Sequence, residues 1–171
     1  MNEETDLHVR FRPAAELATT GERATMRCAI YERSATTLGQ EEDPASPTAQ
    51  RPTCERYIAS RGEDGWQALP TRYDDSGFTG ASLDRPALQR LLNDCEEGRV
   101  DVVVVTSVDR LTRSLIEFAV LVERITKAGV VFVSVKGNLS TLDPAGGLAL
   151  NMVLGFAELE RERVGRTLGR G

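Results

Sequence analysis

The chain has 171 residues, 40% of them hydrophobic, which suits one globular domain with a buried core and leaves too little for two full domains. Its net charge of -5 argues against a free-standing nucleic-acid binder, because affinity for a phosphate backbone comes largely from clustered Lys and Arg. Three cysteines at spacings typical of no zinc or redox motif, and a single histidine, argue against a disulfide framework, a metal site or a Ser-His-Asp triad. We expect no metal and no cofactor.

Residues 1–25 mix charges with small residues and show no sustained period, so we expect a flexible leader ahead of a domain over 26–168. The first strand is predicted over 26–32, "MRCAIYE", and a polar loop with two prolines follows it. Apolar residues at helical spacing predict a helix over 52–61. A weak strand is expected around 66–73.

The second half of the chain alternates more clearly between helix and strand. Pro86 suits the first turn of a helix that ends at Gly98, and its inner face is expected to be Ala87, Leu88, Leu91, Leu92 and Cys95. The run "VDVVVVTSV" predicts a strand buried on both faces. The next helix, "RSLIEFAVLVERITKAG", should turn Leu115, Phe118, Leu121, Val122 and Ile125 inward. A strand "VVFVSV" and a long helix from about 146 to 168 complete the chain.

Alternating strands and helices predict an α/β fold, a three-layer domain whose mostly parallel sheet of about four strands is flanked by helices, with a long C-terminal helix. No run is long enough to cross a bilayer, and the N-terminus lacks an apolar signal core. We therefore expect a cytoplasmic protein without membrane contact.

Polar segments follow three of the predicted strands, over 32–37, 74–85 and 107–113. Chemistry in such sheets gathers at the carboxyl ends of the strands. In "SVDRLTRS", Asp109 precedes Arg110 and Arg113, which would share one face at a helix start and could hold a phosphate. A solvated first turn with an Asp cap is the plainer alternative for this segment.

The arginines of these segments argue for the anion site. Arg33, Arg85, Arg110 and Arg113 come from separate strand ends and point to one region, which an acidic protein would not assemble without an anionic partner or many acidic ones.

Several motifs together resemble the catalytic domain of serine recombinases, the resolvase/invertase group, and most closely its large serine integrase branch. They are "YERSATT", "AQR", "YDDSGFTGASLDRPALQRLL", "VDVVVVTSVDRLTRSLIEFAVLVE", "GVVFVSV" and "LGFAELERERVGRT". The resemblance implies metal-free DNA strand exchange, in which a serine hydroxyl forms a phosphoserine link to a DNA end and releases a 3′-hydroxyl. Its partners would be DNA and a second copy, with a tetramer in synapsis.

The resemblance also implies roles for individual residues. The arginines Arg33, Arg85, Arg110 and Arg113 match the phosphate-binding arginines of the family. Asp109 matches the acid before them, and Gln50 a glutamine near the active site. Asp74 and Asp75 both fit the carboxylate of the second segment, and Asp75 is favoured. A helix beginning at Pro52 would leave Gln50 in the preceding loop.

The nucleophile position departs from the family pattern, because Ala35 stands where the serine is expected. Ser34 lies one position early, and since side chains alternate along a strand it should face away from Arg33. A bulge would turn Ser34 round, and Thr36 is a more hindered alternative. The main interpretation is a recombinase domain that cannot cleave as it stands.

The last helix carries an apolar stripe, Leu148, Met152, Phe156 and Leu159, with Arg161, Arg163 and Arg166 beyond it. The stripe packs either on its own domain or, as the resemblance implies, against a second copy, with the arginines on DNA. No separate DNA-binding domain is expected. A non-catalytic, truncated recombinase-like protein that dimerises or contacts DNA is the alternative function.

Overall fold

The computed structural model describes residues 25–34 and 47–168, with side chains over 25–34 and 49–165. The predicted leader up to residue 24, Ala35 and Thr36 lie outside the described residues. The strands are β1 (Met26–Ser34), β2 (Trp66–Ala68), β3 (Tyr73–Ser76), β4 (Val102–Val105), β5 (Val131–Ser134) and β6 (Leu139–Ser140). The helices are α1 (Pro47–Ser60), the short 3-10 turn η2 (Gly62–Asp64), α2 (Pro86–Glu96), α3 (Val108–Leu111), α4 (Leu115–Lys127) and α5 (Pro144–Leu168).

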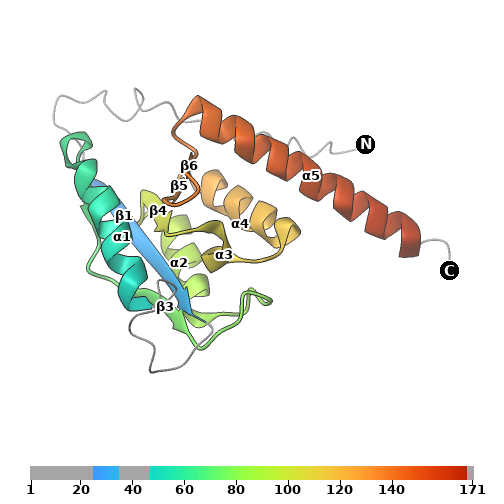
Figure 1. Ribbon diagram of the computed structural model, residues 1–171, viewed down its shortest axis with the longest axis horizontal. Helices are drawn as coiled ribbons and strands as arrows, with labels where there is room; N and C mark the ends of the chain where they lie inside the picture. The colour runs from blue at the N-terminus through green and yellow to red at the C-terminus, as the bar shows by residue number, and fades with distance from the viewer. Residues whose placement is uncertain (1–24, 35–46, 169–171) are drawn as a thin grey trace.

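The sheet has the order β2-β1-β4-β5-β6 among the described residues, and β3 pairs with the end of β1 beyond β2. All pairings are parallel except that of β5 with β6. The α/β class and the mostly parallel sheet are confirmed, with six strands rather than about four. In Figure 1, α1 lies on one side of β1 and helices α2 and α4 on the other.

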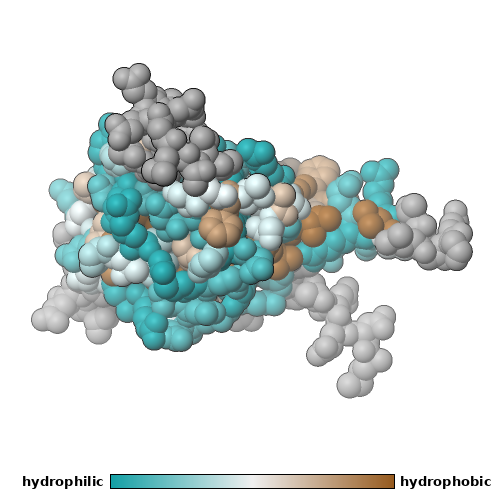
Figure 2. Space-filling view, turned by 90° about the horizontal axis from the view of Figure 1, so that it is seen from below, coloured by the Kyte–Doolittle hydropathy of each residue, from teal (hydrophilic) through white to brown (hydrophobic). Residues whose placement is uncertain are grey.

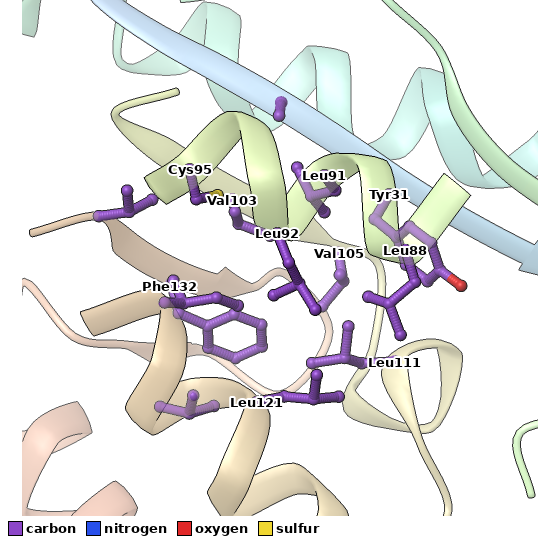
Figure 3. Close-up of a cluster of buried hydrophobic side chains, with 14 of the residues drawn as sticks. Tyr31, Leu88, Leu91, Leu92, Cys95, Val103, Val105, Leu111, Leu121 and Phe132 are labelled. Carbon is purple, nitrogen blue, oxygen red and sulfur yellow. The ribbon is translucent and has the colours of Figure 1, made fainter. Parts of the chain in front are cut away.

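Alternation along the central strands produces two separate cores. Cys28 and Ile30 of β1 face Cys54 and Ile58 of α1 in one hydrophobic cluster. The larger cluster lies on the opposite face of the sheet and joins it to α2 and α4, as Figure 3 shows; it includes Tyr31, Leu88, Leu91, Leu92, Val103, Val105 and Phe132. The predicted inner face of α2 is confirmed in full, because its five apolar residues are all buried. Tyr31 and its neighbours are therefore part of the packed hydrophobic core, and a ligand could reach the sheet only at the ends of its strands.

Two strand predictions need correction. The weak strand over 66–73 is two strands, since β2 ends at Ala68 and β3 starts at Tyr73. Pro70 lies between them, and a proline cannot donate a hydrogen bond to a sheet. Consequently Asp74 and Asp75 belong to β3 and not to the loop after it. The first strand is also longer than predicted and continues through Ser34.

Helix α1 starts at Pro47, five residues before the predicted start, and contains Pro52. Gln50 therefore lies in the helix, not in the preceding loop. The Gln50 side chain exchanges two hydrogen bonds with the backbone of Arg33 in β1, which fixes this turn against the sheet in spite of the proline.

The predicted helix over 113–129 is present as α4 but begins at Leu115, and the segment with Asp109 and Arg110 forms the separate helix α3 before it. Thr112 has extended backbone angles and separates α3 from α4. Its hydroxyl donates to Glu117 and accepts from the Ser114 amide, which stabilises the break. Arg110 and Arg113 therefore do not share a face of one helix, as the sequence suggested. Leu115, expected inside, is 41% exposed because it opens α4.

Helix α5 packs on α4 through Leu154 and Ala157, which contact Ala119. Its predicted apolar stripe lies elsewhere on the helix, and the side chains of Leu148, Met152, Phe156 and Leu159 are 57% to 62% exposed. The alternative in which the stripe packs on its own domain is therefore wrong. Figure 2 shows hydrophobic atoms along the part of α5 that extends from the body of the domain. No helix in the described ranges combines the length and apolarity needed to cross a membrane.

Gly146 holds the start of α5 against β6. A Cβ atom at this position would overlap the backbone of Ser140, at 2.8 Å from its nitrogen. The same atom at Gly165, near the far end of the helix, would meet nothing within 4 Å. The close approach of α5 to the sheet thus requires a glycine at 146.

We predict that Gly146→Ala lowers the free energy of unfolding by about 1–3 kcal/mol, because overpacking forces the helix away from β6. Gly165→Ala, in the same helix, should cause no loss, since alanine favours helix and finds open space. Urea unfolding followed by circular dichroism measures both. Equal stability of the two variants would contradict the packing described for Gly146.

Candidate active site

The site forms where β1, β3 and β4 end and the chain enters α3. β1 and β3 run side by side, with Arg33 opposite Asp75 and Ser34 opposite Ser76. β4 ends at Val105, opposite Tyr31, and leads into α3. Within the described residues, the three polar segments predicted from sequence therefore meet at one edge of the sheet.

Arg33 is buried, at 1% exposure, and all of its guanidinium nitrogens donate to main-chain carbonyls. Nη2 donates to Asp109 at 2.7 Å, Nε to Arg110 at 2.9 Å and Nη1 to Phe78 at 3.1 Å. One side chain thus ties the end of β1 to α3 and to the loop after β3.

Arg85 is equally buried and connects a second set of groups. Its Nη1 donates to the Tyr31 hydroxyl at 2.7 Å, its Nε to the Ser82 carbonyl and its Nη2 to the Leu111 carbonyl. Tyr31 donates in turn to Asp75 at 2.9 Å. Burial raises the pKa of the Tyr31 hydroxyl far above its ordinary value, so the phenol stays protonated as a donor.

Asp75 is buried and accepts two further hydrogen bonds, both at 2.9 Å, from the amides of Ala87 and Leu88. These amides open α2, where the helix has unsatisfied donors and a positive end. Asp75, the favoured carboxylate of the second segment, therefore caps α2 and positions the Tyr31–Arg85 pair. Asp74 is less buried and accepts a hydrogen bond from Ser76.

The Gln50 amide completes the open side of β1. It accepts from the Arg33 amide at 3.2 Å and donates to the Arg33 carbonyl at 3.0 Å. β4 pairs with β1 only as far as Tyr31, so Gln50 supplies the hydrogen bonds that a longer strand would have made. The backbone next to the nucleophile position is consequently held on both sides.

Arg110 and Arg113 are the more accessible arginines. Arg110 makes an ion pair with Asp109 at 2.7 Å and donates to the Arg33 carbonyl at 3.4 Å. Burial alone would raise the pKa of Asp109, but hydrogen bonds from Ser107 and Arg110 and the Arg110 charge lower it overall. Arg113 is exposed, and its guanidinium makes no hydrogen bond or ion pair with any described residue. Gly80 gives room to two arginines, because a Cβ there would lie 3.1 Å from Arg33 Nη2 and 3.3 Å from Arg113 Cγ.

The four predicted arginines are therefore close together. Burial lowers the pKa of Arg33, and the charges of Arg85, Arg110 and Arg113 lower it further. A bound anion would offset this mutual repulsion.

Ser34 lies at the end of β1, buried at 5% exposure. Alternation places its side chain on the face of Glu32 and not on that of Tyr31 and Arg33. The structure describes no bulge within β1, which continues in register with β3 through Ser34. A role for Ser34 as nucleophile stays a prediction, and Ala35 lies outside the described residues.

Glu32 is a buried charge on this second face. Its side chain is fully buried, and neither carboxylate oxygen has a hydrogen-bond partner. Arg72 and Arg51 lie 3.6 Å and 3.8 Å from Oε2. Burial raises the pKa of Glu32 to about 7, because the two arginines only partly offset the lost hydration and Asp74 adds a like charge.

The arginines of α5 lie outside this cluster. Arg161 donates to the Ile116 carbonyl at 3.4 Å, and Arg163 pairs with Glu160 at 3.5 Å. The side chain of Arg166 is not among those described. Contact of these residues with DNA remains a prediction.

Sequence reasoning did not assign roles to Tyr31, Gly80 or Glu32. Tyr31 carried a usable signal, because it lies two residues before Arg33 and must share its face in a strand. Glu32, a charge inside a buried strand, was also visible in "CAIYERS". Nothing in the sequence indicates that Gly80 packs against two arginines.

We predict that Glu32→Gln changes the pH dependence of stability. The folded protein binds the Glu32 proton more tightly than the unfolded chain, so this stabilisation is complete below about pH 4.5 and is lost as pH rises through about 7. The variant should gain about 3 kcal/mol in unfolding free energy over the wild type between pH 4.5 and pH 8, at ~1.4 kcal/mol per pKa unit.

Urea unfolding at a series of pH values measures this difference. Glu55→Gln is the matched control, because Glu55 also pairs with Arg51 but is half-exposed at 46%. A constant difference between Glu32→Gln and the wild type across this pH range would contradict the account of Glu32.

Comparison with known proteins agrees with this geometry. Residues 28–171 match the family described as "Resolvase, N terminal domain". The transposon Tn917 resolvase of Enterococcus faecalis is 36% identical over 84 residues, covering 49% of this chain and 45% of the resolvase. The DNA-invertase of Escherichia phage P1 is 34% identical over 86 residues, covering 50% and 45%. The chain thus spans less than half the length of these relatives.

Among solved structures, the N-terminal catalytic domain of TP901-1 integrase is similar with a TM-score of 0.69 and 38% identity. The similarity covers 80% of this chain and 97% of that domain. The mostly parallel sheet and the long last helix agree with these matches, and the chain belongs to the resolvase N-terminal domain family of serine recombinases.

Proposed function

We propose that the chain is the catalytic domain of a site-specific DNA recombinase whose arginines stabilise phosphoryl transfer without a metal. The observation that carries the proposal is the meeting of Arg33, Arg85, Arg110 and Arg113 at one sheet edge. A phosphoryl-transfer transition state spreads negative charge over its equatorial oxygens, and fixed positive groups stabilise that charge.

The covalent step requires a hydroxyl beside this cluster. The serine oxygen would bond to phosphorus as the bond from phosphorus to the 3′ oxygen breaks. The serine would lose its proton, and the departing oxygen would gain one to become a 3′-hydroxyl. Ala35 cannot supply this oxygen, and alternation turns Ser34 to the other face of β1. We infer that the chain is impaired in cleavage and that a serine at 35 supplies the missing group.

A suicide substrate, a duplex nicked close to the scissile phosphate, tests this proposal by trapping a covalent protein–DNA adduct. We expect no adduct with the wild type and a clear adduct with Ala35→Ser. Arg113→Ala added to Ala35→Ser should lower the rate of adduct formation about 10²–10³-fold, as loss of one transition-state donor does.

Other outcomes separate the alternatives. A wild-type adduct that Ser34→Ala abolishes would identify Ser34 as the nucleophile and contradict the impairment. If Ala35→Ser forms no adduct while the protein still self-associates or binds DNA, the non-catalytic interaction protein is the better description.

The exposed stripe of α5 favours self-association as part of either function. Four large apolar side chains, each more than half exposed, form one row along the helix. Monomeric proteins rarely leave contiguous apolar surface of this kind uncovered. We propose that the stripe contacts α5 or its neighbourhood in a second copy.

Sedimentation equilibrium should show a dimer for the wild type and a monomer for Phe156→Glu, because a buried unpaired charge would oppose association. Glu158→Gln, on the same helix and exposed, should leave the dimer intact. A wild type that stays monomeric at high micromolar concentration would contradict the proposed contact.

A further inference from the structure

The four clustered arginines differ in what their nitrogens already bind. Arg33 has a main-chain carbonyl on each of its three guanidinium nitrogens. Arg85 binds two carbonyls and the Tyr31 hydroxyl in the same manner. Both side chains are 1% exposed. Neither has a guanidinium nitrogen without a partner to offer to a phosphate.

Arg110 and Arg113 are in the opposite situation. The strongest contact of Arg110 is the ion pair with Asp109, whose side chain is 49% exposed and can exchange its partner for solvent. Arg113 is exposed and unpaired among the described residues. A phosphate oxygen could therefore reach these two arginines without breaking a buried hydrogen bond.

We propose a division of labour, which rests on the proposed function: Arg110 and Arg113 contact the DNA phosphate, while Arg33 and Arg85 are positioning residues that hold the carbonyls around them. Turning Arg33 onto a phosphate would leave three carbonyls without their donor, in a region where unpaired polar groups are costly. Its charge still acts on a bound anion through the low dielectric of the site.

The positioning role has a definite geometric meaning. Arg33 binds the carbonyls of Asp109 and Arg110, two successive residues of α3, and Arg85 binds that of Leu111. Together they fix the short helix that carries Arg110. The Gly80 carbonyl accepts from the Arg113 amide, which holds the loop after β3 on the same segment.

Arginine Nε–Hε signals in an NMR spectrum of the ¹⁵N-labelled chain distinguish the two groups. Each signal is assigned by the peak that disappears in Arg33→Lys, Arg85→Lys, Arg110→Lys or Arg113→Lys. We expect inorganic phosphate, and then a short DNA duplex, to shift the Arg110 and Arg113 signals saturably. The Arg33 and Arg85 signals should not move. Arg33→Lys should shift the Arg110 signal without any phosphate, because α3 loses its support.

Salt dependence of duplex binding gives a second measurement. Arg113→Gln should reduce the slope of log affinity against log salt by about one, and Arg99→Gln, which removes an exposed arginine paired with Asp94 and Glu97, should leave the slope unchanged. Phosphate-dependent shifts of Arg33 or Arg85, or no shift of any of the four with either probe, would overturn the proposal. If phosphate shifts Arg110 and Arg113 while the duplex does not bind, the division stands and the recombinase function fails.

Discussion

The architecture of the site depends on the burial of Arg33 against three main-chain carbonyls. Burying a guanidinium is costly unless its nitrogens find acceptors, and here the loop after β3 and α3 supply one carbonyl to each of the three nitrogens. The same residue is held through its backbone by Gln50 of α1. Helices on both faces of the sheet are thus tied to one position, directly before the residues where the family pattern expects its nucleophile. The positive groups around it repel one another, and the hydrophobic layers below keep them together.

The side chains at the end of β1 lie in two different environments, one on each face of the strand. Tyr31 and Arg33 lie on the face that carries Arg85, Asp75 and α3. Glu32 lies on the other face, between arginines of α1 and of the connection before β3. A strand alternates without exception unless a bulge intervenes, so the character of each position follows from its parity. For this reason a hydroxyl at position 34 and one at position 35 would face different surroundings, although the two positions are adjacent.

The buried faces of the helices and strands could be predicted from local sequence patterns, whereas the side-chain hydrogen bonds that join the elements could not. Apolar spacing placed the inner face of α2, and β-branched runs placed the buried strands, because periodicity records which face is buried. The gathering of arginines followed from the rule that parallel strands end at one edge. The cap that Asp75 places on α2, the Gln50 bonds and the break at Thr112 join residues through side-chain hydrogen bonds. Gln50 and Arg33, like Asp75 and the amides of α2, are far apart in the chain, so no local pattern reveals these bonds. Two local patterns also gave wrong predictions: Pro52 suggested a later start for α1, and the spacing of Arg110 and Arg113 suggested one shared helix face.

A crystal structure of the Ala35→Ser variant bound to a nicked duplex would test the central claim most directly. The account predicts that phosphate oxygens lie within hydrogen-bond distance of Arg110 and Arg113, while Arg33 keeps its bonds to the carbonyls of Phe78, Asp109 and Arg110. An Arg33 side chain turned out of those carbonyls and onto the phosphate would contradict it.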